Sequence, residues 1–197
     1  MNDILIRLEG LLIANKASAL DYLLPGISHD EVKTKLSAAE ISPTDDLYSL
    51  YAWRNGTRWE INTSLGSRWI FPGGLFHTID AALQIYDYMY GKEQFWSKYK
   101  FPVIGDGGGD QLLLDLMPGS ATYGSLIYYC PTDTDFEIEI TYFDSLKSCF
   151  VTVCEWYEHK AFYFDHSKIP DLIFDIKLYR EIGKRNNPNS EFWKLHS

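Results

Sequence analysis

The sequence predicts an α+β fold, with an antiparallel sheet of about five to six strands flanked by helices. Apolar residues recur at helical spacing near the N-terminus and again after residue 143. Between these regions, four short apolar runs follow one another with only short connections. A parallel sheet would need a helical crossover between strands, so an antiparallel meander is the arrangement that fits.

Three helices are expected before residue 56. Apolar positions in residues 4–24 mostly recur at helical spacing, and a Pro-Gly pair ends that element. Ser28–Glu31 has the form of a capping box, so a second helix should follow it. Ser42–Asp46 supplies the proline and acids that suit the first turn of a third helix, and Asn55 and Gly56 should stop it.

The middle of the chain changes to short strands separated by Gly, Asn and Pro. Residues 59–61, 67–71 and 75–76 are the first of these, and Thr78–Tyr90 returns to helical spacing. The main sheet is then expected from four consecutive strands: Phe101–Ile104, Gln111–Leu116, Ser125–Cys130 and Phe136–Tyr142.

The last third of the chain should begin with a helix capped by Asp144 and running to about His159. A short strand at Phe162–Phe164, a helix at Leu172–Ile182 and a short terminal helix at 191–195 are expected after it. A polar hinge, Lys184–Ser190, should precede the terminal helix. We expect one domain over residues 1–165 and a C-terminal extension over 166–197.

Composition excludes several classes of protein. The formal net charge of −9 argues against a general affinity for nucleic acid or anionic membranes, and it leaves room for a basic protein partner. No apolar run approaches the roughly 18 residues that a membrane-spanning helix needs. The three cysteines form no C-x-x-C pair, which favours a reduced setting. We therefore expect a soluble, cytoplasmic protein.

The glycine-rich segment between the first two main strands is the strongest local signal. It consists of Gly105, Asp106, Gly107, Gly108, Gly109 and Asp110. A dinucleotide-binding loop would open a helix, whereas this one opens an apolar strand, and its two acids would repel phosphate. Calcium needs six to eight oxygen ligands, and Asp106, Asp110 and Asp115 are too few. A structural sheet turn is the favoured interpretation, and a role in ligand binding stays open.

No catalytic constellation is evident, so no catalytic residue, metal ligand or cofactor is assigned. The five histidines are scattered, and no nucleophile elbow exists. Cys154 lies near His159 and His166 in sequence, so a thiol–imidazole pair stays open as an alternative.

The order of these features resembles the SUKH superfamily, which includes the fungal Smi/Knr-like cell-wall regulators and many bacterial immunity proteins. The matching pieces are Ser42–Gly56, Phe76–Tyr90, Val103–Pro118 and Tyr142–His159. The resemblance spans roughly residues 25–165, and the order of motifs carries it. The family often has Leu-Pro where this chain has Ser42-Pro43, and the segment after His166 has no counterpart in it.

The resemblance implies a non-enzymatic binding module, most often an immunity protein that neutralises a toxin such as a basic nuclease by direct contact. Candidate contact residues are Trp53, Arg54, Trp59, Trp69, Asp106, Asp110 and Tyr123. For each aromatic residue, core packing is the competing interpretation. Two other function classes stay open: a ligand-binding, metal-binding or enzymatic protein that uses the Gly105–Asp110 turn, and a regulatory scaffold.

Overall fold

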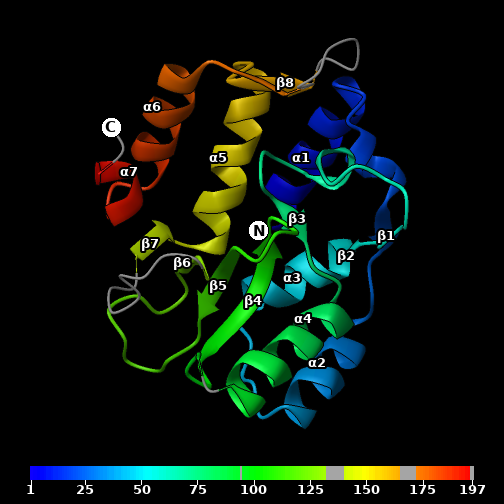
Figure 1. The fold of residues 1–197 in the computed structure, drawn as a ribbon, viewed down its shortest axis with the longest axis vertical. Coiled ribbons are helices and arrows are strands. Elements are labelled where there is room, and N and C mark those ends of the chain that lie inside the picture. Colours follow the sequence, from blue (N-terminus) through cyan, green and yellow to red (C-terminus); the bar gives the residue numbers. More distant parts are fainter. Residues whose placement is uncertain (94, 132–139, 165–171, 196–197) are drawn as a thin grey trace.

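A five-stranded antiparallel sheet lies between two groups of helices in this structure, a computed structural model of the chain (Figure 1). The structure describes residues 1–93, 95–131, 140–164 and 172–195. The strands follow one another in chain order, β3-β4-β5-β6-β7. Their bounds are Leu75–Phe76, Lys100–Gly105, Gln111–Asp115, Leu126–Tyr129 and Ile140–Phe143. The predicted α+β class is confirmed. The first part of the strand expected at 136–142 lies outside the described residues.

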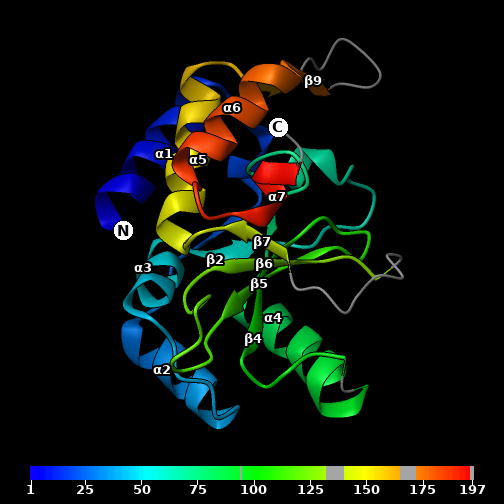
Figure 2. The same ribbon diagram turned by 90° about the vertical axis from the view of Figure 1, so that its left-hand side faces the viewer.

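Alternating side chains of the central strands are buried on opposite faces of the sheet. Leu112 and Leu114 of β5 belong to the main core, which includes most buried residues of α5, Leu146–Glu158. Leu113 belongs to a smaller cluster with Trp96 and Ile127 on the other face, next to α4, Ile79–Tyr86. Both faces are therefore covered, and Figure 2 shows α5 above the sheet and α4 below it.

The N-terminal region contains α1 (Asn2–Ala14), α2 (His29–Ala38) and α3 (Asp45–Trp53). The Ser28 hydroxyl caps α2 by accepting a hydrogen bond from the Glu31 amide at 3.2 Å, as its sequence pattern predicts. The first predicted helix was too long. It ends at Ala14, because Lys16 has a φ of 51°, and a short 3₁₀ turn at Ser18–Asp21 follows.

Strands β1 (Leu23–Pro25) and β2 (Arg54–Thr57) form a separate two-stranded sheet. Helix α3 ends at Trp53, close to the stop predicted at Asn55 and Gly56, but these two residues lie in a strand rather than in a turn. Gly56 has a φ of +73°, and a Cβ there would lie 2.2 Å from the Thr78 nitrogen. This residue is a glycine because the backbone of Thr78 passes too close for any side chain.

Between β2 and β3, residues 59–61 and 67–71 do not form the expected strands. Gly66–Arg68 is a 3₁₀ turn instead. The helix expected at Thr78–Tyr90 is α4, which begins with Thr78 as its cap and continues into a π-helical segment at Asp87–Lys92. The glycine and proline residues of this region predicted where regular secondary structure is interrupted, but not which structure forms between the interruptions.

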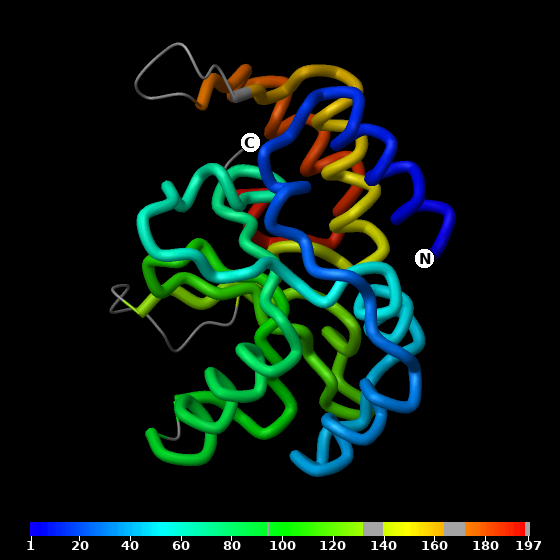
Figure 3. The backbone as a smooth tube through the Cα atoms, turned by 90° about the vertical axis from the view of Figure 1, so that its right-hand side faces the viewer, coloured from blue at the N-terminus to red at the C-terminus, as the bar shows by residue number. Residues whose placement is uncertain are grey.

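Helix α5 lies above the sheet in Figure 2. Ser145, rather than the predicted Asp144, caps it: its hydroxyl accepts from the Ser148 amide, and the Ser148 hydroxyl accepts from the Ser145 amide. Figure 3 shows α1 lying beside α5. A bidentate ion pair joins the two helices, because Arg7 donates to both carboxylate oxygens of Glu158.

The C-terminal region contains β8 (Phe162–Phe164), β9 (Leu172–Phe174), α6 (Ile176–Asn186) and α7 (Glu191–Leu195). The helix expected at Leu172–Ile182 therefore begins later, after a strand that pairs with β8. Tertiary pairing overrides the local apolar spacing here.

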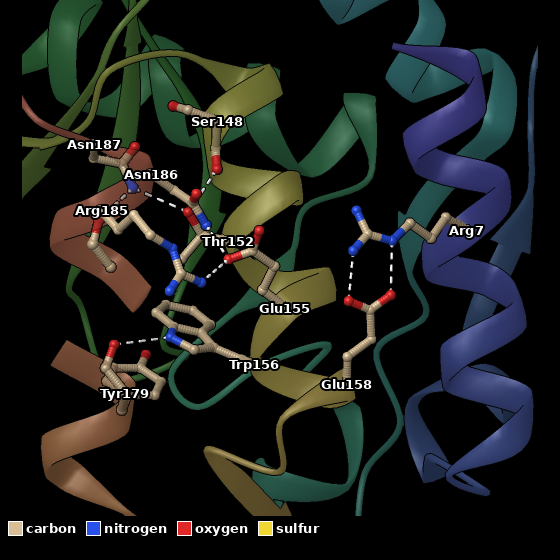
Figure 4. Close-up of polar contacts among 11 residues, drawn as sticks. Arg7, Ser148, Thr152, Glu155, Trp156, Glu158, Tyr179, Arg185, Asn186 and Asn187 are labelled. Carbon is tan, nitrogen blue, oxygen red and sulfur yellow. Dashed lines mark hydrogen bonds and ion pairs between the residues drawn. The ribbon is translucent and has the colours of Figure 1, made fainter. Parts of the chain in front are cut away.

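Helix α6 packs against the side of α5 away from α1 (Figure 4). The Trp156 indole stacks on Tyr179 at 3.9 Å and donates its N–H to the Tyr179 carbonyl. The stretch at 184–190 is not a polar hinge, because Asn187 and Ser190 are fully buried. Asn187 donates to the Thr152 hydroxyl at 3.0 Å. These contacts hold α6 and α7 on the core.

None of the helices in the described ranges is long and apolar enough to cross a membrane.

Candidate functional site

The glycine-rich turn between β4 and β5 is organised by the carboxylate of Asp106. One oxygen of Asp106 accepts hydrogen bonds from the amides of Gly108, Gly109 and Asp110 at 2.7, 2.9 and 2.9 Å. Gly107 and Gly109 have φ angles of +87° and +130°, which other residues rarely adopt. Asp106 thus holds the turn in a conformation that only glycines at these positions allow.

Close packing also restricts the turn. A Cβ on Gly107 would lie 2.6 Å from a methyl of Leu65, and one on Gly105 would lie 2.8 Å from the His77 ring. His77 is buried, and its Nε2 shares a hydrogen bond of 2.7 Å with the Gln111 amide oxygen. Burial lowers the pKa of His77, and the Gln111 contact opposes this shift only in part.

A cavity of about 210 Å³ opens beside this turn, on the sheet face that α5 and α7 cover. Its lining comes from the turn, the loop before β3, the strands β5 to β7 and α7: Phe71, Pro72, Gly73, Gly105, Asp106, Asp110, Gln111, Leu112, Tyr128, Tyr142 and Phe192. Segments that are far apart in the chain thus line one cavity.

Asp110 and Tyr128 are the polar pair of the cavity. The Tyr128 hydroxyl donates to a carboxylate oxygen of Asp110 at 2.5 Å. Burial raises the pKa of Tyr128, and the hydrogen bond to Asp110 raises it further. The phenol therefore stays protonated at neutral pH and donates to the Asp110 carboxylate in the cavity lining.

Two of the candidate contact residues lie on the loop beside the turn. The Trp69 indole donates to the Asp106 carbonyl at 3.1 Å, which ties this loop to the turn. Trp59 is 65% exposed, and the Arg68 guanidinium lies 4.2 Å from the centre of its ring. Trp59, Trp69, Asp106 and Asp110 therefore share one region of the molecule.

The remaining candidates lie elsewhere. Trp53 and Arg54 both donate to the Glu9 carboxylate of α1, so they join α3 and β2 to α1. Tyr123 is 49% exposed, in the loop between β5 and β6. Because β5 runs away from the glycine turn, this loop lies at the opposite end of the strand. The structure does not bring these three residues to the cavity.

Asp115 also lies at that opposite end and cannot join Asp106 and Asp110 around one metal ion. It is 1% exposed, accepts hydrogen bonds from Ser120 and Thr122 hydroxyls, and lies 3.3 Å from the Lys100 ammonium. In the part of the chain that the structure describes, no group of three or more His, Cys, Asp or Glu side chains could hold a metal ion.

The thiol of Cys154 is buried in α5 and contacts the Ile4 carbonyl at 3.7 Å. Burial raises its pKa to about 12, so at neutral pH it stays a thiol and is a poor nucleophile. His166, one of its proposed partners, lies outside the described residues.

Sequence reasoning missed most of the cavity lining. Tyr128 and Tyr142 lie in predicted strands, but nothing in the sequence shows which face they occupy at a strand end. Phe192 lies in the short terminal helix, and its contact with Tyr142, with ring centres 4.1 Å apart, depends on tertiary packing alone. Arg68, which contacts Trp59 and is not part of the cavity lining, had no local signal in the sequence either.

The helices α3 and α4, the meander β3 to β7 and the closing helix α5 together define a SUKH-type α+β domain. Residues 43–152 match the SMI1/KNR4 family (SUKH-1), and this stretch covers more than half of the chain. The chain therefore belongs to that family, as its resemblance predicted. A search of curated proteins found no match. The matched stretch includes the glycine turn and ends within α5, so α6, α7 and Phe192 lie outside it.

Proposed function

We propose that this chain is a non-enzymatic, cytoplasmic protein-binding module that neutralises a basic toxin, such as a nuclease, by direct contact. The surface around the glycine turn carries the proposal. It combines an exposed tryptophan, Trp59, with a cavity that contains aromatic rings and Asp110. Tryptophan and tyrosine in partly buried positions are typical energetic anchors of protein interfaces.

Charge supports the same assignment. The net charge of −9 would attract a basic partner over several ångströms and increase the rate of encounter. Occlusion is the expected mechanism: the acidic and aromatic surface would cover the catalytic face of the toxin. Family membership supports a SUKH domain as such, and the immunity role is our extension of it.

Co-purification from the source cells tests the proposal. A tagged full-length chain should recover a basic protein that forms a stoichiometric complex when both are purified. Production of that protein alone should arrest growth, and co-production of this chain should restore it. Trp59→Ala should weaken rescue, whereas Ile13→Ala, which changes an exposed side chain on α1, should not. Recovery of no protein, or a captured protein whose toxicity this chain leaves unchanged, would count against the proposal.

A small-ligand protein is the second candidate, because the cavity offers a hollow with a carboxylate. Calorimetry with calcium, magnesium and common nucleotides separates the two. A stoichiometric, sub-millimolar signal that Asp110→Asn abolishes would favour this candidate. A regulatory scaffold differs from both in binding several protein partners at once, which cross-linking of the co-purified complex would reveal.

A further inference from the structure

The aromatic rings of Tyr128, Tyr142 and Phe192 line the cavity together. Tyr142 and Phe192 lie with ring centres 4.1 Å apart and planes inclined by 31°. The Tyr128 ring lies 5.9 Å from the first and 6.0 Å from the second. The face of an aromatic ring carries partial negative charge and attracts ammonium and guanidinium groups.

Asp110 adds a full negative charge to this aromatic wall. One of its oxygens accepts the Tyr128 hydrogen bond, and across the described ranges Asp110 forms no ion pair. Asp106 differs, because the three amides of the turn already bind one of its oxygens. Asp106 forms no ion pair in the described ranges either, but three amides stabilise its charge, whereas a single hydroxyl donates to Asp110. Asp110 is therefore the less compensated carboxylate and the better receiver of a cation.

The size of the cavity restricts the groups that can fit inside it. It encloses about 210 Å³, less than the roughly 300–1,000 Å³ of pockets that take drug-sized ligands. Its lining combines the rings of Phe71, Tyr128, Tyr142 and Phe192 with the carboxylates of Asp106 and Asp110. A group with an apolar stem and a charged head fits this pattern, and lysine and arginine side chains have that form.

We infer that the cavity binds a lysine or arginine side chain presented by a protein partner, an inference that rests on the function proposed above. The charged head lies at Asp110, and the stem packs on Tyr128, Tyr142 and Phe192. One wall, Phe192, comes from outside the stretch that matches the family. The C-terminal helices therefore complete the cavity, and they help to decide which partner this chain accepts.

The test uses the full chain labelled with ¹⁵N and three probes: the N-acetyl methylamides of lysine, arginine and norleucine. Norleucine has the apolar stem without the charge. We expect the lysine and arginine probes to shift the amide resonances of 107–110 and the indole N–H of Trp69 saturably, because that N–H bonds to the turn. The norleucine probe should not shift them. Absence of shifts, or equal shifts with norleucine, would overturn the inference.

Two variants and their controls assign the contacts. Asp110→Asn keeps an oxygen that can accept the Tyr128 hydrogen bond but removes the charge. It should lower the affinity of the lysine and arginine probes roughly 10- to 100-fold. Phe192→Leu keeps an apolar wall without a ring and should lower this affinity by about 2- to 30-fold. Asp3→Asn and Phe95→Leu make matching changes at exposed sites outside the cavity lining and should leave binding unchanged. Unchanged affinity in Asp110→Asn would also overturn the inference.

The cation has two possible sources, a side chain of a protein partner or a free small molecule. The complex with the partner recovered by co-purification distinguishes them. Asp110→Asn should weaken the purified complex at least about tenfold. If the probes bind but the complex is insensitive to Asp110→Asn, the occupant is a free amine, and the partner source is wrong. If the probes bind but co-purification recovers no protein, the proposed function is wrong, and so is the inference that a protein partner supplies the cation. Only the preference of the cavity for cations then stands.

Discussion

Replacing Asp115 by asparagine tests whether this carboxylate holds the far end of the sheet together. Asp115 accepts hydrogen bonds from the Met117 amide and from the Ser120 and Thr122 hydroxyls at 2.9, 3.0 and 2.6 Å. The Lys100 ammonium lies 3.3 Å away, and both side chains of this pair are buried. Asparagine has the same shape, but it turns an N–H₂ group toward some of these donors and removes the charge opposite Lys100.

The expected loss follows from these contacts. A hydrogen bond to a charged group contributes about 1.5–3 kcal/mol, and breaking a buried ion pair by changing one partner costs about 3–5 kcal/mol. These losses overlap because they involve the same carboxylate, so they do not add. We expect Asp115→Asn to lower the free energy of unfolding by about 3–5 kcal/mol at pH 7.

Urea-induced unfolding at a series of pH values measures this loss. Burial alone would raise the pKa of Asp115, but its hydrogen bonds and Lys100 outweigh burial and lower it below the ordinary value of 3.8. The stability that the carboxylate contributes is thus present above pH 3.8 and lost as the pH falls through the folded-state pKa. The difference between wild type and variant should shrink accordingly. A difference under about 1 kcal/mol at pH 7, or one that does not change with pH, would refute this reasoning.

Three further outcomes are expected. Burial keeps the folded-state pKa of His77 below 6.5, so the unfolded state binds more protons, and the free energy of unfolding should fall as the pH drops below that value. His77→Gln should flatten this decline in urea titrations. Gly56→Ala should cost at least about 2 kcal/mol, because alanine avoids its φ of +73° and its Cβ would meet the backbone of Thr78. Cys149 and Cys154 should resist a thiol reagent until the protein unfolds, because burial raises the pKa of both thiols.

Each of these outcomes has its own control. Gly10→Ala changes a glycine of α1 with open space around it, so it should stabilise the protein slightly, opposite in sign to Gly56→Ala. An equally steep pH dependence in His77→Gln would remove His77 as its source. Mass spectrometry of the labelled native protein would reveal any modification at Cys149 or Cys154.

The parts of the fold that depend on short-range patterns could be predicted from the sequence. Apolar runs with short connections predicted the meander, and Ser28 predicted the start of α2 because its hydroxyl meets an amide three residues away. The leucines before Pro25 misled the prediction, since the spacing of a helix continued into residues that pair with β2 instead. Local spacing does not reveal such pairing.

The candidate site was predictable only in part. Glycines and aspartates marked the turn, because backbone conformation leaves a local trace in the sequence. The aromatic wall left none: Tyr128, Tyr142 and Phe192 meet only after β6, β7 and α7 have packed together. Polar composition predicts a hinge around Asn187 and Ser190, whereas both are buried, because their hydrogen-bond partners in α5 and β7 are distant in sequence.

The pairing of α1 with α5 has a consequence for synthesis on the ribosome. Arg7 and its partner Glu158 are 151 positions apart, and at about 5–20 residues per second the ribosome needs about 8–30 s to make the chain between them. Throughout that interval the nascent α1 carries Leu5, Leu8 and Leu12 without the surface that later buries them. Helix α1 is thus made well before the helix on which it docks, and a chaperone that shields apolar segments would act on it during this wait.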